Sequence, residues 1–177
     1  MTKTTKVKDS KNREFRTVTQ KTQVTCGPAC CLIMWANVYD ADPQADEGGV
    51  IALSKAFPKP WNAVTGAEIN NLSSVLRQMG VRTKVETFTN NGNLKTALTT
   101  KIKPKKPVLV FVEWEVDANV KGHFAVCAAA MSSEDRYTVL DPMYGLQEMV
   151  GLPYYYPYTS GDEVISLKFT GAVAFVE

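Results

Sequence analysis

The stretch from Gln20 to Cys31 constrains the fold of this chain more than any other. It reads QKTQVTCGPACC and is followed by the apolar run LIMW, so we predict a helix over about residues 26–39. This helix is apolar nearly all round, and such a helix is normally buried in the middle of a domain. Because proline is tolerated in the first helical turn, Pro28 places Cys26 at or next to the N-cap.

A cysteine at a helix N-terminus lies close to unpaired backbone N–H groups and to the positive end of the helix dipole. Both favour the thiolate over the thiol, and the thiolate is the nucleophile. We therefore interpret Cys26 as a reactive residue. Cys30 and Cys31 fall in the helix body and are expected in the core, and all four cysteines are expected to be free thiols, because a chain of 177 residues does not need disulfides to fold.

Length and composition predict a single globular domain. We expect a flexible N-terminal tail over residues 1–14 and one domain over residues 15–177. A net charge of +2 is too small to favour nucleic acid or a membrane surface as the main partner. The sequence has no membrane-spanning run and no secretory signal, so we expect a soluble protein, either cytoplasmic or delivered by a specialised secretion system.

The order of the predicted elements is typical of an α+β protein, with helices first and an antiparallel sheet afterwards. After the first helix we expect a short helix over 50–56, a helix capped by Thr65 with Glu68 and closed by Gly80, and another helix over 93–101. Strands are predicted at 81–88, at PVLVFVEW, at HFAVCAAAM, at YTVLDP and over 163–177, with a loop over 145–158.

A nucleophilic cysteine needs a base, and the sequence contains one histidine, His123. An imidazole beside a thiol forms an ion pair with it and later protonates a leaving amine. Asp141, at the end of the next strand, is the predicted orienting group for the imidazole. A turn at SSED leaves His123 and Asp141 about three residues out of register, so a bulge or a longer loop must close that gap.

Acyl transfer also requires hydrogen-bond donors for an oxyanion. The backbone N–H of Cys26 is one candidate donor, and the side-chain amide of Gln20 is the second. Gln23 is the alternative to Gln20.

These motifs together resemble the papain-like cysteine peptidases, and most of all the bacterial peptidase domains that process double-glycine leaders of bacteriocins. The resemblance is carried by Gln20, by CGPAC at 26–30, by GHFAV around His123 and by LDPMYG around Asp141. It implies a papain-like fold, with a central helix that carries the cysteine packed on a C-terminal antiparallel sheet. The resemblance also implies a role for each matching residue. Gln20 is the oxyanion glutamine, Cys26 the nucleophile, His123 the general base and Asp141 the orienting aspartate.

Several functions fit this resemblance. The first is a peptidase with a protein or peptide substrate, for which a role as a bacterial effector or toxin with an immunity or inhibitor protein as partner is one expectation. The alternatives are a glutamine deamidase or amide transferase on the same fold, and a binding module without catalysis. A Cys3His zinc site is disfavoured, because His123 and Cys127 lie about 13 Å apart on a strand. We therefore expect neither a metal nor a cofactor.

Overall fold

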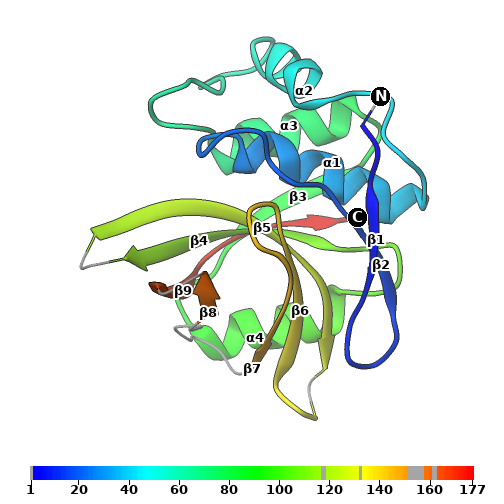
Figure 1. Cartoon of the computed structure of the whole chain (residues 1–177), viewed down its shortest axis with the longest axis vertical. Coiled ribbons are helices and arrows are strands. Elements are labelled where there is room, and N and C mark those ends of the chain that lie inside the picture. The colour runs from blue at the N-terminus through cyan, green and yellow to red at the C-terminus, as the bar shows by residue number, and fades with distance from the viewer. Residues whose placement is uncertain (1, 117–118, 132, 151–157, 161–162) are drawn as a thin grey trace.

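A computed structural model describes residues 2–116, 119–131, 133–150, 158–160 and 163–177. Figure 1 shows an antiparallel sheet with helices on both of its faces. Helices α1 (Cys26–Tyr39), α2 (Glu47–Ser54) and α3 (Ile69–Gln78) lie on one face, and α4 (Asn91–Lys101) covers the opposite face. None of the described helices is long and apolar enough to cross a membrane.

The main sheet follows the order β3-β9-β4-β5-β6-β7, and the short strand β8 pairs with β9. All of these neighbours are antiparallel, which confirms the predicted α+β class. The strands are β3 (Thr83–Thr87), β4 (Val108–Val116), β5 (Asn119–Met131), β6 (Arg136–Asp141), β7 (Gly145–Val150), β8 (Tyr158–Ser160) and β9 (Glu163–Val176).

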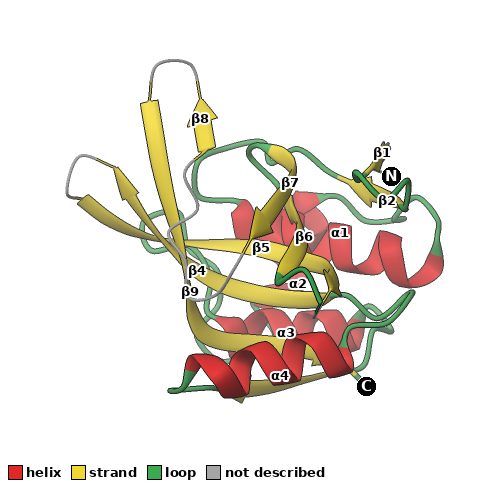
Figure 2. Cartoon of the chain, turned by 90° about the horizontal axis from the view of Figure 1, so that it is seen from below, coloured by secondary structure: helices red, strands yellow, loops and turns green. Residues whose placement is uncertain are grey.

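Two hydrophobic cores lie on the two faces of this sheet. Figure 2 shows the sheet and its helices from below. Successive side chains of a strand point to opposite faces, so β4 supplies both cores. Val108 and Val110 pack in the core that includes α4, whereas Leu109 packs in the core formed with α1 and α3. The apolar run PVLVFVEW is therefore explained by burial on both sides.

Helix α1 has the bounds that the sequence predicts, and most of its residues are buried. The tight packing of α1 explains why residue 27 is a glycine. A Cβ at this position would lie 2.9 Å from Leu72 Cδ1 and 3.0 Å from Ala67 Cβ. Only a residue without a side chain allows α3 and the segment before it to approach the first turn of α1 this closely.

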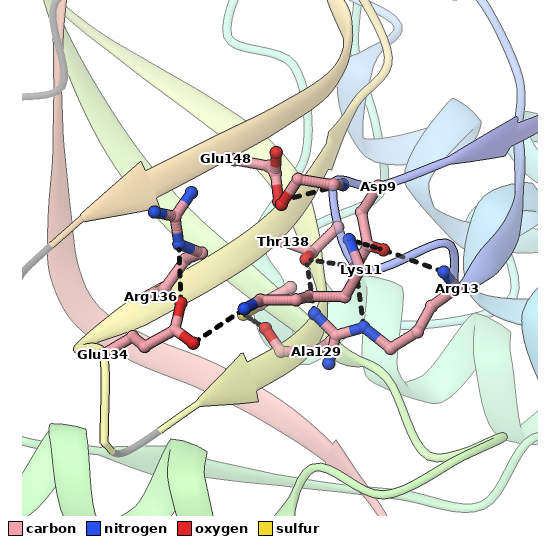
Figure 3. A network of polar contacts seen from close by, with 10 residues as sticks. Asp9, Lys11, Arg13, Ala129, Glu134, Arg136, Thr138 and Glu148 are labelled. Carbon is pink, nitrogen blue, oxygen red and sulfur yellow. Dashed lines mark hydrogen bonds and ion pairs between the residues drawn. The ribbon is translucent and has the colours of Figure 1, made fainter.

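The N-terminal segment differs from the flexible tail that was expected for residues 1–14. Strand β1 (Thr5–Lys8) pairs with β2 (Glu14–Thr17) in a hairpin. In its turn, buried Asp9 accepts a bond of 2.7 Å from Arg13 Nε and one of 3.1 Å from the hydroxyl of Thr138 in β6 (Figure 3). A buried carboxylate with these partners fixes the hairpin against the sheet. The polar composition of residues 1–14, on which the predicted flexible tail was based, does not indicate this contact.

Other differences concern element boundaries. The predicted cap at Thr65 is wrong, because α3 begins at Ile69 with Glu68 as its N-cap, and Thr65 instead closes a turn with Asn62. Helix α2 begins at Glu47 rather than Val50. The segment 145–150 is strand β7 instead of loop, whereas the tyrosine-rich cluster at 151–157 lies outside the described residues. Strands β4 and β5 extend to Val116 and Asn119, so each is longer than the predicted strands PVLVFVEW and HFAVCAAAM.

Candidate active site

Cys26 is the first residue of α1, and Thr25 is its N-cap. The Thr25 hydroxyl donates to the Thr22 carbonyl at 3.0 Å and makes no capping bond to the helix. The first-turn N–H groups of α1 therefore have no side-chain cap, which leaves them to bind an anion or an oxyanion. Cys26 is 9% exposed, so its thiol lies at the edge of the core.

His123 and Asp141 form a buried hydrogen-bonded pair. His123 Nε2 lies 3.0 Å from Asp141 Oδ2, and the two residues are 3% and 1% exposed. The other carboxylate oxygen, Oδ1, accepts the backbone N–H groups of Met143 and Tyr144 at 2.7 and 3.1 Å. Because both oxygens are bonded, the carboxylate is fixed in one orientation and in turn orients the imidazole.

The Cys26 thiol acts on the same imidazole, since its interaction with the ring raises the pKa of His123. Burial by itself lowers this pKa, but the interactions with Asp141 and Cys26 outweigh burial and raise the pKa to about 9. The site therefore brings a thiol, an imidazole and a carboxylate together, with the imidazole hydrogen-bonded to the carboxylate.

A β-bulge in β5 brings His123 and Asp141 to the same face of the sheet. At the turn Met131 pairs with Arg136, and this register would place Asp141 opposite Val126. The register shifts between Cys127 and Ala129, so Val126 pairs with Leu140 instead, and Ala125 comes opposite Asp141. His123 is two residues from Ala125, and residues two apart share a face. Of the two devices that the sequence allowed, a bulge or a longer loop, the structure has the bulge. It shifts the register by one residue rather than three, and the remaining offset of two residues leaves both side chains on one face.

Gln20 lies beside this site through its backbone. Its N–H donates to the Pro142 carbonyl at 2.8 Å, one residue beyond Asp141. Its side-chain Nε2 donates to the Thr22 carbonyl at 2.7 Å, and that nitrogen carries a second hydrogen. Gln23, the alternative donor, is exposed. The loop that carries Gln20 therefore touches both the helix start and the Asp141 turn.

Glu47 is a residue near this site that sequence analysis did not identify. It is 3% exposed, and its Oε1 accepts the backbone N–H of Lys21 at 2.9 Å. Its Oε2 is buried and accepts no hydrogen bond within the described residues. Burial raises the pKa of Glu47, against the opposing effects of Thr25 and of the Lys21 N–H. The first turn of α2 thereby supports the loop between Gln20 and Cys26.

The remaining cysteines are buried free thiols. Burial raises the pKa of Cys30 and Cys31, and it raises that of Cys127 to about 12. Thiols with raised pKa values and no exposure are poor nucleophiles. Within the part of the chain that the structure describes, no three His, Cys, Asp or Glu side chains are grouped to hold a metal ion.

Comparison with known proteins finds likeness in structure but not in sequence. No protein-family model and no curated protein matches the chain. Among solved structures, a double-glycine motif protease from an AMS/PCAT transporter, in complex with its leader peptide, matches with a TM-score of 0.52 at 16% identity, over 88% of this chain and 90% of that one. The peptidase domain of Streptococcus mutans ComA matches with a TM-score of 0.51 at 15% identity, over 91% and 98%.

These matches establish the class of fold. The chain has the α+β fold of the double-glycine peptidase domains, over nearly their whole length. This is the papain-like architecture that the resemblance of the motifs implied. At such low identity the likeness speaks for the fold, and the chemistry has to be argued from the site itself.

Proposed function

We propose that this protein is a papain-like cysteine peptidase that hydrolyses peptide bonds through a thioester on Cys26. The observation that carries the proposal is the hydrogen-bonded pair of His123 and Asp141, whose imidazole also interacts with Cys26 at the N-terminus of a buried helix. A nucleophile, a base and an orienting carboxylate in this order are the parts that acyl transfer needs.

In the first step, the Cys26 thiolate attacks the carbonyl carbon of the scissile bond. The negative charge moves to the carbonyl oxygen, where the Cys26 N–H and the Gln20 amide donate to it. The C–N bond then breaks, and the His123 imidazolium gives its proton to the leaving amine. The products of this step are a free amine and an acyl group held on sulfur.

In the second step, water attacks the thioester. His123, now neutral, accepts a proton from the water, and Asp141 stabilises the imidazolium that forms again. The C–S bond breaks, and the carboxylic acid leaves as the thiolate is restored. Asp141 stays ionised throughout and acts on the position and charge of the ring.

A peptide is the substrate class that the comparisons support, because the protease from the AMS/PCAT transporter was solved with a leader peptide bound. Glu47 acts in this scheme as a positioning residue, since it holds the backbone between the Gln20 donor and Cys26. A role as a bacterial effector or toxin, with an immunity or inhibitor protein as partner, stays a prediction.

The test of this function is the variant Cys26→Ala, assayed against a peptide library by mass spectrometry. Cleavage by the native chain and none by the variant, with unchanged circular dichroism, is the expected result. Cleavage that persists in Cys26→Ala would refute the thioester. A gain of about one dalton in a substrate without chain cleavage would instead assign the deamidase chemistry that the same intermediate allows.

A further inference from the structure

The N-terminal hairpin joins the two layers of the molecule that carry the proposed active site. Helix α1 carries Cys26, whereas β5 and β6 carry His123 and Asp141. We call residues 2–17 the strap, because they contain β1, β2 and the turn between them. Figure 1 shows the strap, in blue, extending from the level of α1 to beside the sheet. The strap contacts the two layers at its opposite ends, and the peptidase mechanism given above does not use these contacts.

At its base the strap is hydrogen-bonded to α1 and to the residues that follow this helix. Asn37 of α1 accepts the backbone N–H of Arg16 at 2.9 Å and donates to the Arg16 carbonyl at 2.7 Å. Arg16 Nε donates to Asp40 at 2.9 Å, and its Nη1 donates to Asp42 at 3.3 Å. The backbone N–H of Thr4 donates to Asp42 at 3.1 Å. These directional bonds fix β2 to the C-terminal end of α1.

At its tip the strap is held on β6 by a buried carboxylate (Figure 3). The Asp9 side chain is 0% exposed, and its Oδ2 accepts Arg13 Nε at 2.7 Å and the Thr138 hydroxyl at 3.1 Å. Its Oδ1 accepts the backbone N–H groups of Lys11 and Arg13 at 3.0 and 2.9 Å. Burial alone would raise the pKa of Asp9, but the interactions with Arg13 and Thr138 outweigh burial, and the pKa is lowered. The group is therefore an ionised carboxylate with both oxygens bonded.

Thr138 connects this carboxylate to the strand that carries the orienting aspartate. It is fully buried in β6, three residues before Asp141, and its hydroxyl also accepts a bond of 3.2 Å from Arg13 Nη2. Beyond β2 the chain continues to Gln20, whose N–H donates to the Pro142 carbonyl. The chain is therefore bonded to the Asp141 strand at the tip of the strap and again just after the strap ends.

The apolar packing of α1 on the sheet does not by itself fix the helix along its own axis. Apolar contacts are non-directional, and packed helices can slide past their neighbours in small shear movements. Hydrogen bonds are directional, so a segment that is bonded to α1 at one end and to β6 at the other opposes such sliding. This matters for catalysis, because a misplacement of about 1 Å between reacting groups can slow a reaction by about 100-fold.

We propose that the strap sets the position of the Cys26 thiol relative to the His123 imidazole, with Asp9 as its positioning residue. Asp9 acts through the contact of the strap with β6, and not on the reacting groups themselves. The inference rests on the proposed function, in which the thiol and the imidazole react together. When the contact at Asp9 is weakened, the strap no longer opposes the sliding of α1, and the thiol moves relative to the ring.

The test measures the His123 imidazole directly in the variant Asp9→Asn. His123 is the only histidine in the sequence, so proton NMR follows the titration of its ring without ambiguity. In Asp9→Asn an NH2 group replaces one of the two accepting oxygens. The midpoint near pH 9 should fall by at least about half a pH unit, because the thiol that helps to raise it moves away. The value of kcat should fall by about 10-fold, with KM within about a factor of two.

The matched control is Glu14→Gln, which removes the ion pair of 2.6 Å between Glu14 and Lys6. This pair joins β1 to β2 inside the hairpin, so its loss leaves the contacts with α1 and β6 in place, and the midpoint and kcat should stay at the native values. A second variant, Thr138→Val, removes only the hydroxyl that Asp9 accepts. It should shift the midpoint in the same direction as Asp9→Asn by a smaller amount, and it replaces Asp9→Asn if that variant does not fold.

An unchanged midpoint in the folded variants at Asp9 and Thr138, or an equal shift in Glu14→Gln, would overturn the inference. Circular dichroism shows which variants are folded. If the midpoint shifts as expected but the native chain cleaves no peptide, the peptidase function is wrong, whereas the positioning of the thiol by the strap holds. The two proposals can therefore fail separately.

Discussion

The imidazole of His123 and the carboxylate of Asp141 meet at 3.0 Å because β5 contains a bulge of one extra residue where it pairs with β6. A shift of one residue in register moves a side chain to the other face of a sheet. Without the bulge between Cys127 and Ala129, the pair would lie on opposite faces. A local irregularity five residues from His123 thus decides whether the imidazole has an orienting partner.

The first prediction concerns pH. The pKa of His123 is raised to about 9, so the imidazolium is retained through neutral pH and is lost as the pH rises through that value. In the proposed mechanism the imidazolium protonates the leaving amine, so kcat/KM should fall with a midpoint near pH 9. Asp141→Asn removes an interaction that raises this pKa, so the midpoint should move to lower pH and kcat should fall by about 10-fold or more. A descending limb that stays in place in Asp141→Asn would contradict the pairing.

A second prediction is that alkylation selects one cysteine. Iodoacetamide at neutral pH should modify Cys26 at least about 100-fold faster than the other thiols, because those are fully buried and have raised pKa values. Peptide mapping by mass spectrometry measures the ratio. His123→Ala should slow the reaction of Cys26 toward that of a simple thiol. Equal labelling of Cys26 and Cys127 in the folded chain would point to a binding module without an activated nucleophile.

The third prediction tests Glu47. Glu47→Gln keeps the shape but weakens the acceptor for the Lys21 N–H, so the loop that carries Gln20 should lose definition. We expect kcat to fall by about 10-fold with little change in KM, as for a loss of transition-state positioning. Asp46→Asn is the matched control on the same helix end, since asparagine caps α2 as well as aspartate does. An equal fall in both variants would mean a general loss of stability.

A fourth prediction concerns Gly27. In Gly27→Ala the new methyl would clash with Leu72 and Ala67, so the free energy of unfolding should fall by about 1–3 kcal/mol. Gly49→Ala, inside α2, meets nothing nearer than 3.6 Å and should instead stabilise the chain by about 0.4–1 kcal/mol. Urea unfolding of both variants measures the difference. If both changes had the same sign, the close approach at α1 would not be the reason for the glycine.

The sequence by itself determined the parts that depend on neighbours along the chain. The proline in the first turn and the apolar residues that follow predicted α1 with its bounds, and the β-branched runs predicted β4, β5 and β6. The residue types of Cys26, His123 and Asp141 predicted which groups meet. The misplaced start of α3 at Thr65 shows the limit of this reasoning, because a local capping pattern was outweighed by the turn with Asn62.

Tertiary structure alone decided the relationships between residues that are distant in the chain. Three such relationships join residues many positions apart. They are the bulge at Ala128, the support of the Gln20 loop by Glu47 and the anchoring of the N-terminal hairpin by Asp9. Burial converts such contacts into strong constraints, since a buried polar group must find a partner wherever the fold offers one. The local sequence pattern does not predict which partner a buried polar group finds, because that partner depends on the packing of the whole chain.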